Sequence, residues 1–189
     1  MEQLIIYKLT KNTMKKLLFS LALVAGLGFA ASAQTEGAVK KLSIGAEFGI
    51  PTESNSDTFI AGGSLMAEFP VAKSFNVTGS AGYLSLMLTG DSKDAYKAAG
   101  LSTSTGIIPL KVGGKYYFGG NFYGAGEVGA AISTEDGGGT AFAFAPTLGA
   151  SFSVSDKGSL DFGVRYENWS RNGNSSGIVG LRAAYAFGL

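Results

Sequence analysis

The stretch that decides the fold is AFAFAPTLGASFSV, residues Ala141 to Val154. Phe142, Phe144 and Leu148 share one face of it, whereas Ala, Thr, Gly and Ser fill the alternate positions. Alternation with period two indicates a β-strand whose two faces meet different surroundings. One face is expected to meet an apolar medium, and the other a space with room for small side chains.

The same alternation recurs along the chain, whereas no stretch after the N-terminal region has a convincing helical period. The C-terminal GLRAAYAFGL, for example, sets Leu181, Tyr185 and Phe187 against Arg182 and small residues. Together with the opening stretch, the sequence predicts eight strands. The other seven are expected at 42–50, 59–69, 75–88, 107–118, 122–132, 160–169 and 180–189.

The connections between these segments alternate in length. PVAKS, GGN and SDKG are short, and the four others are longer and polar. Tight turns at one end and long loops at the other are typical of an eight-stranded outer-membrane barrel. We predict an all-β fold, an eight-stranded antiparallel up-and-down transmembrane β-barrel with both chain ends on the periplasmic, short-turn side. The long connections are 51–58, 89–106, 133–140 and 170–176.

The N-terminus carries the pattern of a secretory signal peptide. MKK at 14–16 is followed by an apolar run and by ASA at 31–33, a small-x-small cleavage site. The run is shorter than the about 20 residues that a spanning helix needs, which disfavours an uncleaved anchor. We expect residues 1–13 to be an upstream extension, 14–33 a cleaved signal peptide and 34–189 the barrel domain.

The composition excludes several classes of function. The chain has no Cys and no His, and so lacks thiol chemistry and the commonest general base and transition-metal ligand. Only 15% of its residues are charged, against about 25% in ordinary soluble domains. Residues 1–33 hold four Lys and one Glu, so 11 basic and 13 acidic residues remain after them, a net charge of −2. We therefore predict no enzyme activity, no cofactor, no metal site and no nucleic-acid partner.

The alternation alone does not decide which face meets lipid. The polar faces are mostly Gly, Ala, Ser and Thr, which suit the narrow interior of a small barrel. Aromatic residues gather near strand ends, as in the girdles at membrane interfaces. Both features favour lipid outside, over a soluble secreted barrel that carries an apolar ligand. The expected interfacial aromatics are Phe69, Phe75, Tyr116, Phe118, Phe122, Tyr166, Trp169, Tyr185 and Phe187.

Charged strand residues fall on the face predicted to line the lumen. On the lipid face, a Lys or Arg near the bilayer midplane would cost about 2–4 kcal/mol. We expect acids and bases to pair across the lumen, as a structural plug or as the lining of a narrow ion path. The expected lumen network is Glu47, Glu68, Lys111, Lys115, Glu127, Asp161, Arg165, Glu167 and Arg182.

Strand registers make two of these pairings specific. The GGN turn places Glu127 opposite Gly113, so its diagonal neighbours Lys111 and Lys115 are its expected partners. The first and last strands must pair to close the barrel. That closure brings Glu47 and Arg182 onto neighbouring strands.

The stretch IPLKVGGKYYFGGNFYGAGEVG, residues 108–129, is similar to the strand–turn–strand of small outer-membrane barrels. The terminal AYAF resembles the aromatic-ended last strand of the same proteins, although this chain ends in Gly188 and Leu189. The region after residue 33 as a whole resembles the OmpA/OmpX-type barrels of Gram-negative bacteria. The resemblance implies outer-membrane lipid and the barrel-assembly machinery as partners, and we expect a monomer.

Two classes of function remain open. One is a structural or surface-interaction barrel whose outer loops contact an unidentified cell-surface or host ligand, and the other is a narrow channel for ions or small solutes. GAGEVG, residues 124–129, matches the spacing of a dinucleotide-binding loop, but no helix follows and Gly149 stands where the acidic residue belongs. Nucleotide binding is therefore rejected. Gly124 and Gly126 fall on the outer face, where close packing between strands or a bend is the expected reason.

Overall fold

The structure is a computed structural model that describes residues 39–53, 56–135 and 137–189. The expected upstream extension at 1–13 and the expected signal peptide at 14–33 lie outside the described residues. Residues 34–38 of the expected barrel domain also lie outside them.

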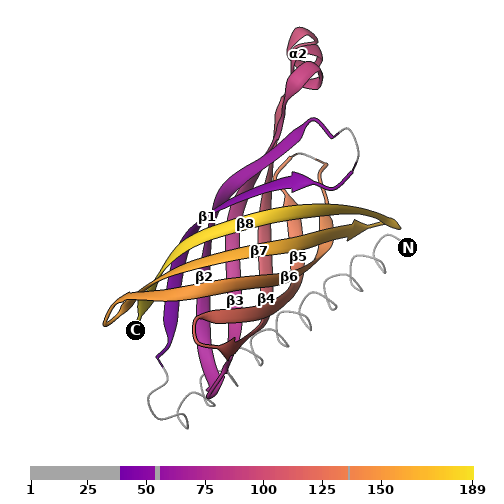
Figure 1. Ribbon diagram of the computed structural model, residues 1–189. Coiled ribbons are helices and arrows are strands. Elements are labelled where there is room, and N and C mark those ends of the chain that lie inside the picture. The colour runs from indigo at the N-terminus through magenta and orange to yellow at the C-terminus, as the bar shows by residue number, and fades with distance from the viewer. Residues whose placement is uncertain (1–38, 54–55, 136) are drawn as a thin grey trace, which may run out of the picture.

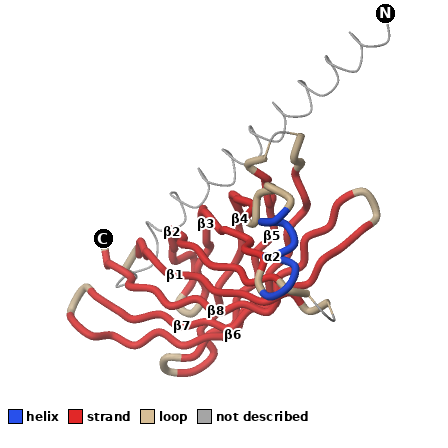
Figure 2. The backbone as a smooth tube through the Cα atoms, turned by 90° about the horizontal axis from the view of Figure 1, so that it is seen from above, coloured by secondary structure: helices blue, strands red, loops and turns tan. Residues whose placement is uncertain are grey.

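Eight antiparallel strands form a closed barrel in which each strand pairs with its neighbours in the sequence and β8 pairs with β1. The predicted eight-stranded up-and-down barrel is confirmed. Figure 2 shows that strand makes up nearly all of the described backbone. The strands are β1 (Lys41–Pro51), β2 (Thr58–Ala72), β3 (Phe75–Leu88), β4 (Ser104–Gly119), β5 (Phe122–Ser133), β6 (Thr140–Ser155), β7 (Gly158–Arg171) and β8 (Asn174–Gly188).

The two ends of the barrel differ as the sequence predicts. The tight β2–β3, β4–β5 and β6–β7 turns lie at the same end as the C-terminus (Figure 1). At the other end the strands run further than expected. The expected loop at 170–176 is a two-residue turn, with Asn172 and Gly173 at φ 50° and 82°. Positive φ at both positions suits the type I′ hairpin, for which Asn-Gly is the preferred pair.

The connection between β3 and β4, expected to be a loop, contains a helix, α2 (Gly90–Ala98). It projects beyond the barrel at the long-loop end (Figure 1), and none of its residues is buried. At its C-terminal end the Leu101 N–H donates to the Tyr96 carbonyl at 3.0 Å, past Gly100 at φ 70°. This is a Schellman end, which satisfies carbonyls of the last turn. Among the described residues, no helix is both long and apolar enough to cross a membrane.

Candidate functional site

The barrel interior holds the charged residues of the strands, and Lys115 of β4 lies at the centre of one group. Its Nζ is 2.8 Å from Glu68 Oε1 and 2.6 Å from Asp161 Oδ2, and Lys115 is 2% exposed. Because the interior excludes solvent, each carboxylate depends on this ammonium for compensation. Glu68 also accepts a hydrogen bond from Asn76 Nδ2 at 3.0 Å.

Two tyrosines outside the expected lumen network complete this group. Tyr123 Oη donates to Asp161 Oδ1 at 2.7 Å, and Tyr117 Oη donates to Glu68 Oε2 at 3.3 Å. Lys115 Nζ lies 3.9 Å from the centroid of the Tyr123 ring, a cation–π distance. Tyr117 lies two residues from Lys115, and Tyr123 lies four residues from Glu127. Each tyrosine is therefore on the lumen face of its strand, as the alternation of the sequence predicts.

Arg165 of β7 is the centre of a second group nearer the long loops. Its guanidinium contacts Glu47 and lies 3.0 Å from Glu167 Oε2. Lys111 Nζ reaches the same Glu167 oxygen at 2.9 Å, and Trp169 Nε1 donates to the other at 2.8 Å. Glu167 is thus held by two bases and an indole.

Arg182 of β8 joins the two groups. It lies opposite Glu47 in the β1–β8 register, with Nε 3.6 Å from Glu47 Oε1, and its Nη1 is 4.0 Å from Asp161 Oδ1. It also donates to the Ser64 and Ser43 hydroxyls, each at 3.0 Å. Eight of the nine expected lumen residues therefore form one chain of ion pairs. In order of contact these are Glu68, Lys115, Asp161, Arg182, Glu47, Arg165, Glu167 and Lys111.

Glu127 is the ninth residue, and its expected ion pairs with Lys111 and Lys115 are wrong. It does lie opposite Gly113, as the turn predicts. Its carboxylate instead accepts a hydrogen bond from Ser80 Oγ at 2.7 Å. Lysine side chains are long enough to cross a narrow lumen, so both lysines reach acids on strands that are distant around the wall.

An apolar layer of side chains lies in the lumen between the ion pairs and the long loops. Leu84 belongs to it, which explains why an apolar residue interrupts the polar face of β3. The expectation that Trp169 joins the outer aromatic girdle is wrong, because its ring packs against this layer and its Nε1 binds Glu167. Trp169 lies two residues after Glu167 and therefore on the same, lumen-facing side of β7. This position outweighs the preference of Trp for membrane interfaces. The buried members of the layer are Ile60, Leu84, Ile107, Ala131, Ala143 and Ile178.

Two small cavities adjoin the ion pairs of the lumen. One cavity of about 20 Å³ lies beside Thr78, Lys115 and Glu127, and another of about 10 Å³ lies beside Trp169 and Glu47. A single water needs roughly 10–15 Å³, so each cavity has room for about one water. No group of three or more Asp or Glu side chains among the described residues is arranged to hold a metal ion.

Of the comparisons with known proteins, the one with solved structures finds similar folds. No family model and no curated protein matches the chain. Neisserial surface protein A is 13% identical with a TM-score of 0.57, covering 79% of this chain and 97% of its own. Ail of Yersinia pestis in a phospholipid nanodisc is 18% identical with a TM-score of 0.53, and the match covers 79% of this chain and 99% of Ail. OprG of Pseudomonas aeruginosa is 12% identical with a TM-score of 0.53, and the match covers 80% of this chain and 96% of OprG.

The chain has the fold of the small outer-membrane β-barrels. The resemblance to the OmpA/OmpX type is therefore confirmed at the level of the fold. At these identities the outer-membrane barrel fold is what the comparison establishes, and sequence similarity assigns no ligand.

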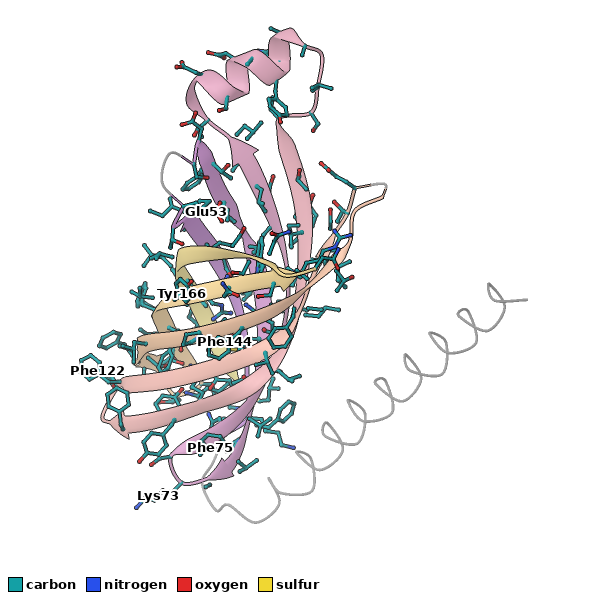
Figure 3. The ribbon with its side chains drawn as sticks, turned by 90° about the vertical axis from the view of Figure 1, so that its right-hand side faces the viewer. Glu53, Lys73, Phe75, Phe122, Phe144 and Tyr166 are labelled. Carbon is teal, nitrogen blue, oxygen red and sulfur yellow. The ribbon has the colours of Figure 1, made fainter. Side chains whose placement is uncertain are left out.

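The outer wall of the barrel is apolar around its circumference. Leu148, Ile44 and Leu181 are 67%, 57% and 56% exposed, whereas the strand charges face inward. Figure 3 shows Phe75 and Phe122 toward the short turns and Tyr166 nearer the long loops. Five of the expected interfacial aromatics are more than a third exposed at the short-turn end, and Phe69 and Tyr185 are half-buried there. The five are Phe75, Tyr116, Phe118, Phe122 and Phe187.

Proposed function

We propose that this chain is a monomeric barrel of the outer membrane of a Gram-negative bacterium. In this proposal its lumen is closed to ions, it has no enzymatic activity, and it acts as a structural or surface-interaction protein through its outer loops. One observation carries the closed lumen. A continuous set of ion pairs fills the interior beneath an apolar layer, and the two cavities beside them have volumes of only about 20 and 10 Å³.

The two layers oppose ion passage for different physical reasons. The eight paired side chains compensate one another's charge, and the low dielectric makes their separation costly. An apolar constriction blocks ions because it does not hold a continuous column of water. Both barriers lie in series along the lumen, so the opening of one would leave the other in place.

The loop end presents an ordered surface, which supports an interaction role. Asp57 holds the start of α2, because its carbonyl accepts the Thr89 N–H at 2.7 Å and its carboxylate accepts the Ser92 hydroxyl at 2.9 Å. The helix exposes Tyr96, which is 47% accessible, and the loop after it exposes Leu101, which is 58% accessible. A fixed helix with exposed aromatic and apolar side chains costs little ordering entropy on binding.

We predict no steady conductance when the purified, refolded protein is inserted into a planar bilayer. The reason is the filled lumen, and a general porin added to the same bilayer shows that the measurement detects pores. Insertion is checked by heat-modifiable migration on gels. A large, steady conductance from the pure protein would contradict the closed lumen and favour the narrow channel.

We predict that replacing residues 90–100 by a short Gly-Ser turn leaves folding intact, because no residue of α2 is buried. Cells that display this variant are expected to lose the adhesion or surface phenotype that the wild type restores to a deletion strain. Permeability to small solutes should not change. A variant with the turn at Asn172-Gly173 replaced by the same linker is the control, and equal phenotypes for both variants would exclude α2 as the contact.

A further inference from the structure

The glycines of GAGEVG differ in what surrounds them. Gly129 faces the interior, and a Cβ there would collide with the backbone carbonyl of Leu110. Gly126 faces outward, and a Cβ there would meet nothing within 4 Å. A Cβ on Gly124 would make ordinary contacts at 3.7 Å with Phe118 and 3.8 Å with Leu148. Packing within the protein therefore requires glycine at 129 but not at 124 or 126.

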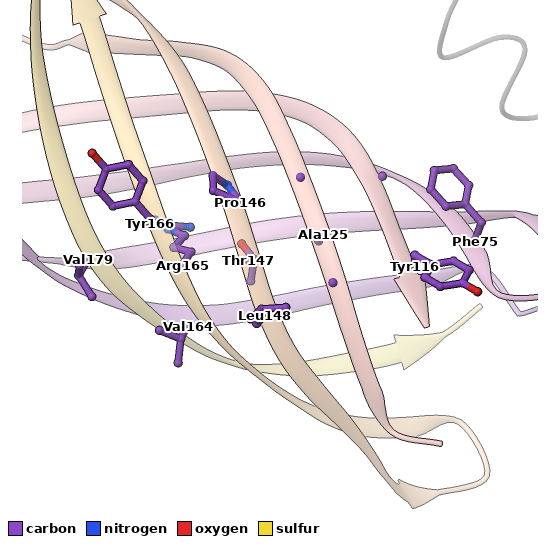
Figure 4. Close-up of a pocket in the computed structure, with 13 residues that line it drawn as sticks. Phe75, Tyr116, Ala125, Pro146, Thr147, Leu148, Val164, Arg165, Tyr166 and Val179 are labelled. Atoms are coloured by element: carbon purple, nitrogen blue, oxygen red, sulfur yellow. The ribbon is translucent and has the colours of Figure 1, made fainter. Parts of the chain in front are cut away.

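Glycine within a strand weakens it, and it often marks a place where a ligand approaches the backbone closely. Gly124 and Gly126 line a groove of about 620 Å³ on the outer wall, beside Gly114 of the neighbouring strand. Figure 4 shows the groove with Phe75 and Tyr116 toward one end and Tyr166 and Val179 toward the other. Apolar side chains dominate its sides. They are Phe75, Tyr116, Leu148, Val164, Tyr166 and Val179.

The strand pairing of the wall is interrupted along the same groove. Pro146 lies in it and has no N–H to donate. Pairing between β6 and β7 stops after Phe144–Asn168 and resumes at Thr147–Arg165. The groove thus results from the backbone of the wall itself, with its glycines and interrupted pairing, rather than from the spacing of bulky side chains.

The short-turn end of the groove indicates its occupant. The groove runs from Phe75 and Tyr116, near the short turns, past Gly126 and Pro146 in the middle of their strands, to Tyr166 and Val179 nearer the long loops. Lys73 is exposed in the turn just before Phe75 and lies at the short-turn end in Figure 3. An apolar hollow that opens at the membrane interface beside a base fits a phospholipid.

We infer that this groove binds one acyl chain of an inner-leaflet phospholipid, with the phosphate at the level of Lys73. The inference rests on the proposed placement in the membrane. A hydrocarbon chain is narrow enough to lie against the glycine backbone and covers it with dispersion contacts. A second barrel would instead present a broad wall, which Leu148 at the groove edge, 67% exposed, would hold away from the floor.

The test is native mass spectrometry of the refolded protein in micelles containing dimyristoylphosphatidylglycerol. The wild type is expected to retain one lipid. Gly126→Leu fills the groove and should weaken retention at least about tenfold, the equivalent of displacing about two methylenes from contact. Gly63→Leu is the matched control, since Gly63 is an outward glycine of β2 outside the groove, with its nearest neighbour at 3.4 Å. Lys73→Gln should weaken retention about fivefold.

Folding of each variant is checked by heat-modifiable migration, and Gly124→Leu replaces Gly126→Leu if the latter fails to fold. Equal lipid retention by the wild type, Gly126→Leu and Gly63→Leu would overturn the inference. A dimer peak that Gly126→Leu abolishes would also overturn it, in favour of a second copy as the occupant. Because this measurement does not depend on conductance, a conducting lumen would refute the proposed function and leave the lipid site standing.

Discussion

Lys115→Met is expected to destabilise the barrel by about 3–5 kcal/mol, the usual cost of removing one partner from a buried ion pair. Lys115 compensates both Glu68 and Asp161, and all three side chains are at most 4% exposed. Without the ammonium, two carboxylates face each other in the lumen with only neutral hydrogen-bond donors and the more distant Arg182. The measurement is urea unfolding of protein refolded in phosphatidylcholine vesicles, followed by the fluorescence of Trp169.

Two further variants separate the charge effect from loss of packing. Lys157→Met changes an exposed lysine in the β6–β7 turn and is expected to leave stability unchanged. Adding Glu68→Gln and Asp161→Asn to Lys115→Met should recover most of the lost stability, because no uncompensated charge remains. If Lys115→Met unfolds at the wild-type urea concentration, Lys115 does not hold these acids together in the membrane.

Leu148→Arg is expected to destabilise the barrel by about 2–4 kcal/mol, as found for cations at the lipid face near the bilayer midplane. Leu148 is 67% exposed in the middle of β6, on the face it shares with Phe144 and Phe152. In a soluble carrier barrel the same change would place a charge in water at almost no cost. The result therefore discriminates between the two environments, measured as urea unfolding in vesicles.

Leu101→Arg is the matched control for this experiment. Leu101 is 58% exposed but follows α2 in the β3–β4 loop, beyond the barrel wall. A charge there stays in water in either environment, so no loss of stability is expected. Equal stability of Leu148→Arg and the wild type in vesicles would argue against a lipid-facing wall.

Much of the fold was predictable because the strands and tight turns of a barrel depend on residues that are close together in the sequence. The alternation in 141–154 assigns each side chain to a face, and a tight turn fixes the register of the strands that flank it. The GGN turn thus predicted that Glu127 faces Gly113, as the structure has it. The helix α2 was not predicted because it is short, polar and exposed. It is held in place by Asp57 and by its Schellman end rather than by an apolar stripe that a sequence pattern would show.

The sequence by itself determined which side chains share a face of each strand, because the period of two is a property of the strand, and the small and charged residues of one face marked it as the lumen side. The same alternation places Tyr117, Tyr123 and Trp169 on the lumen side of their strands. Only the tertiary structure decided which charges meet. Lys115 and Asp161 are distant in the chain, and their contact at 2.6 Å depends on how the closed wall brings β4 and β7 across the lumen. Closure likewise decided that two glycines of GAGEVG lie in an outer groove, because a groove is formed by several neighbouring strands and by no single one.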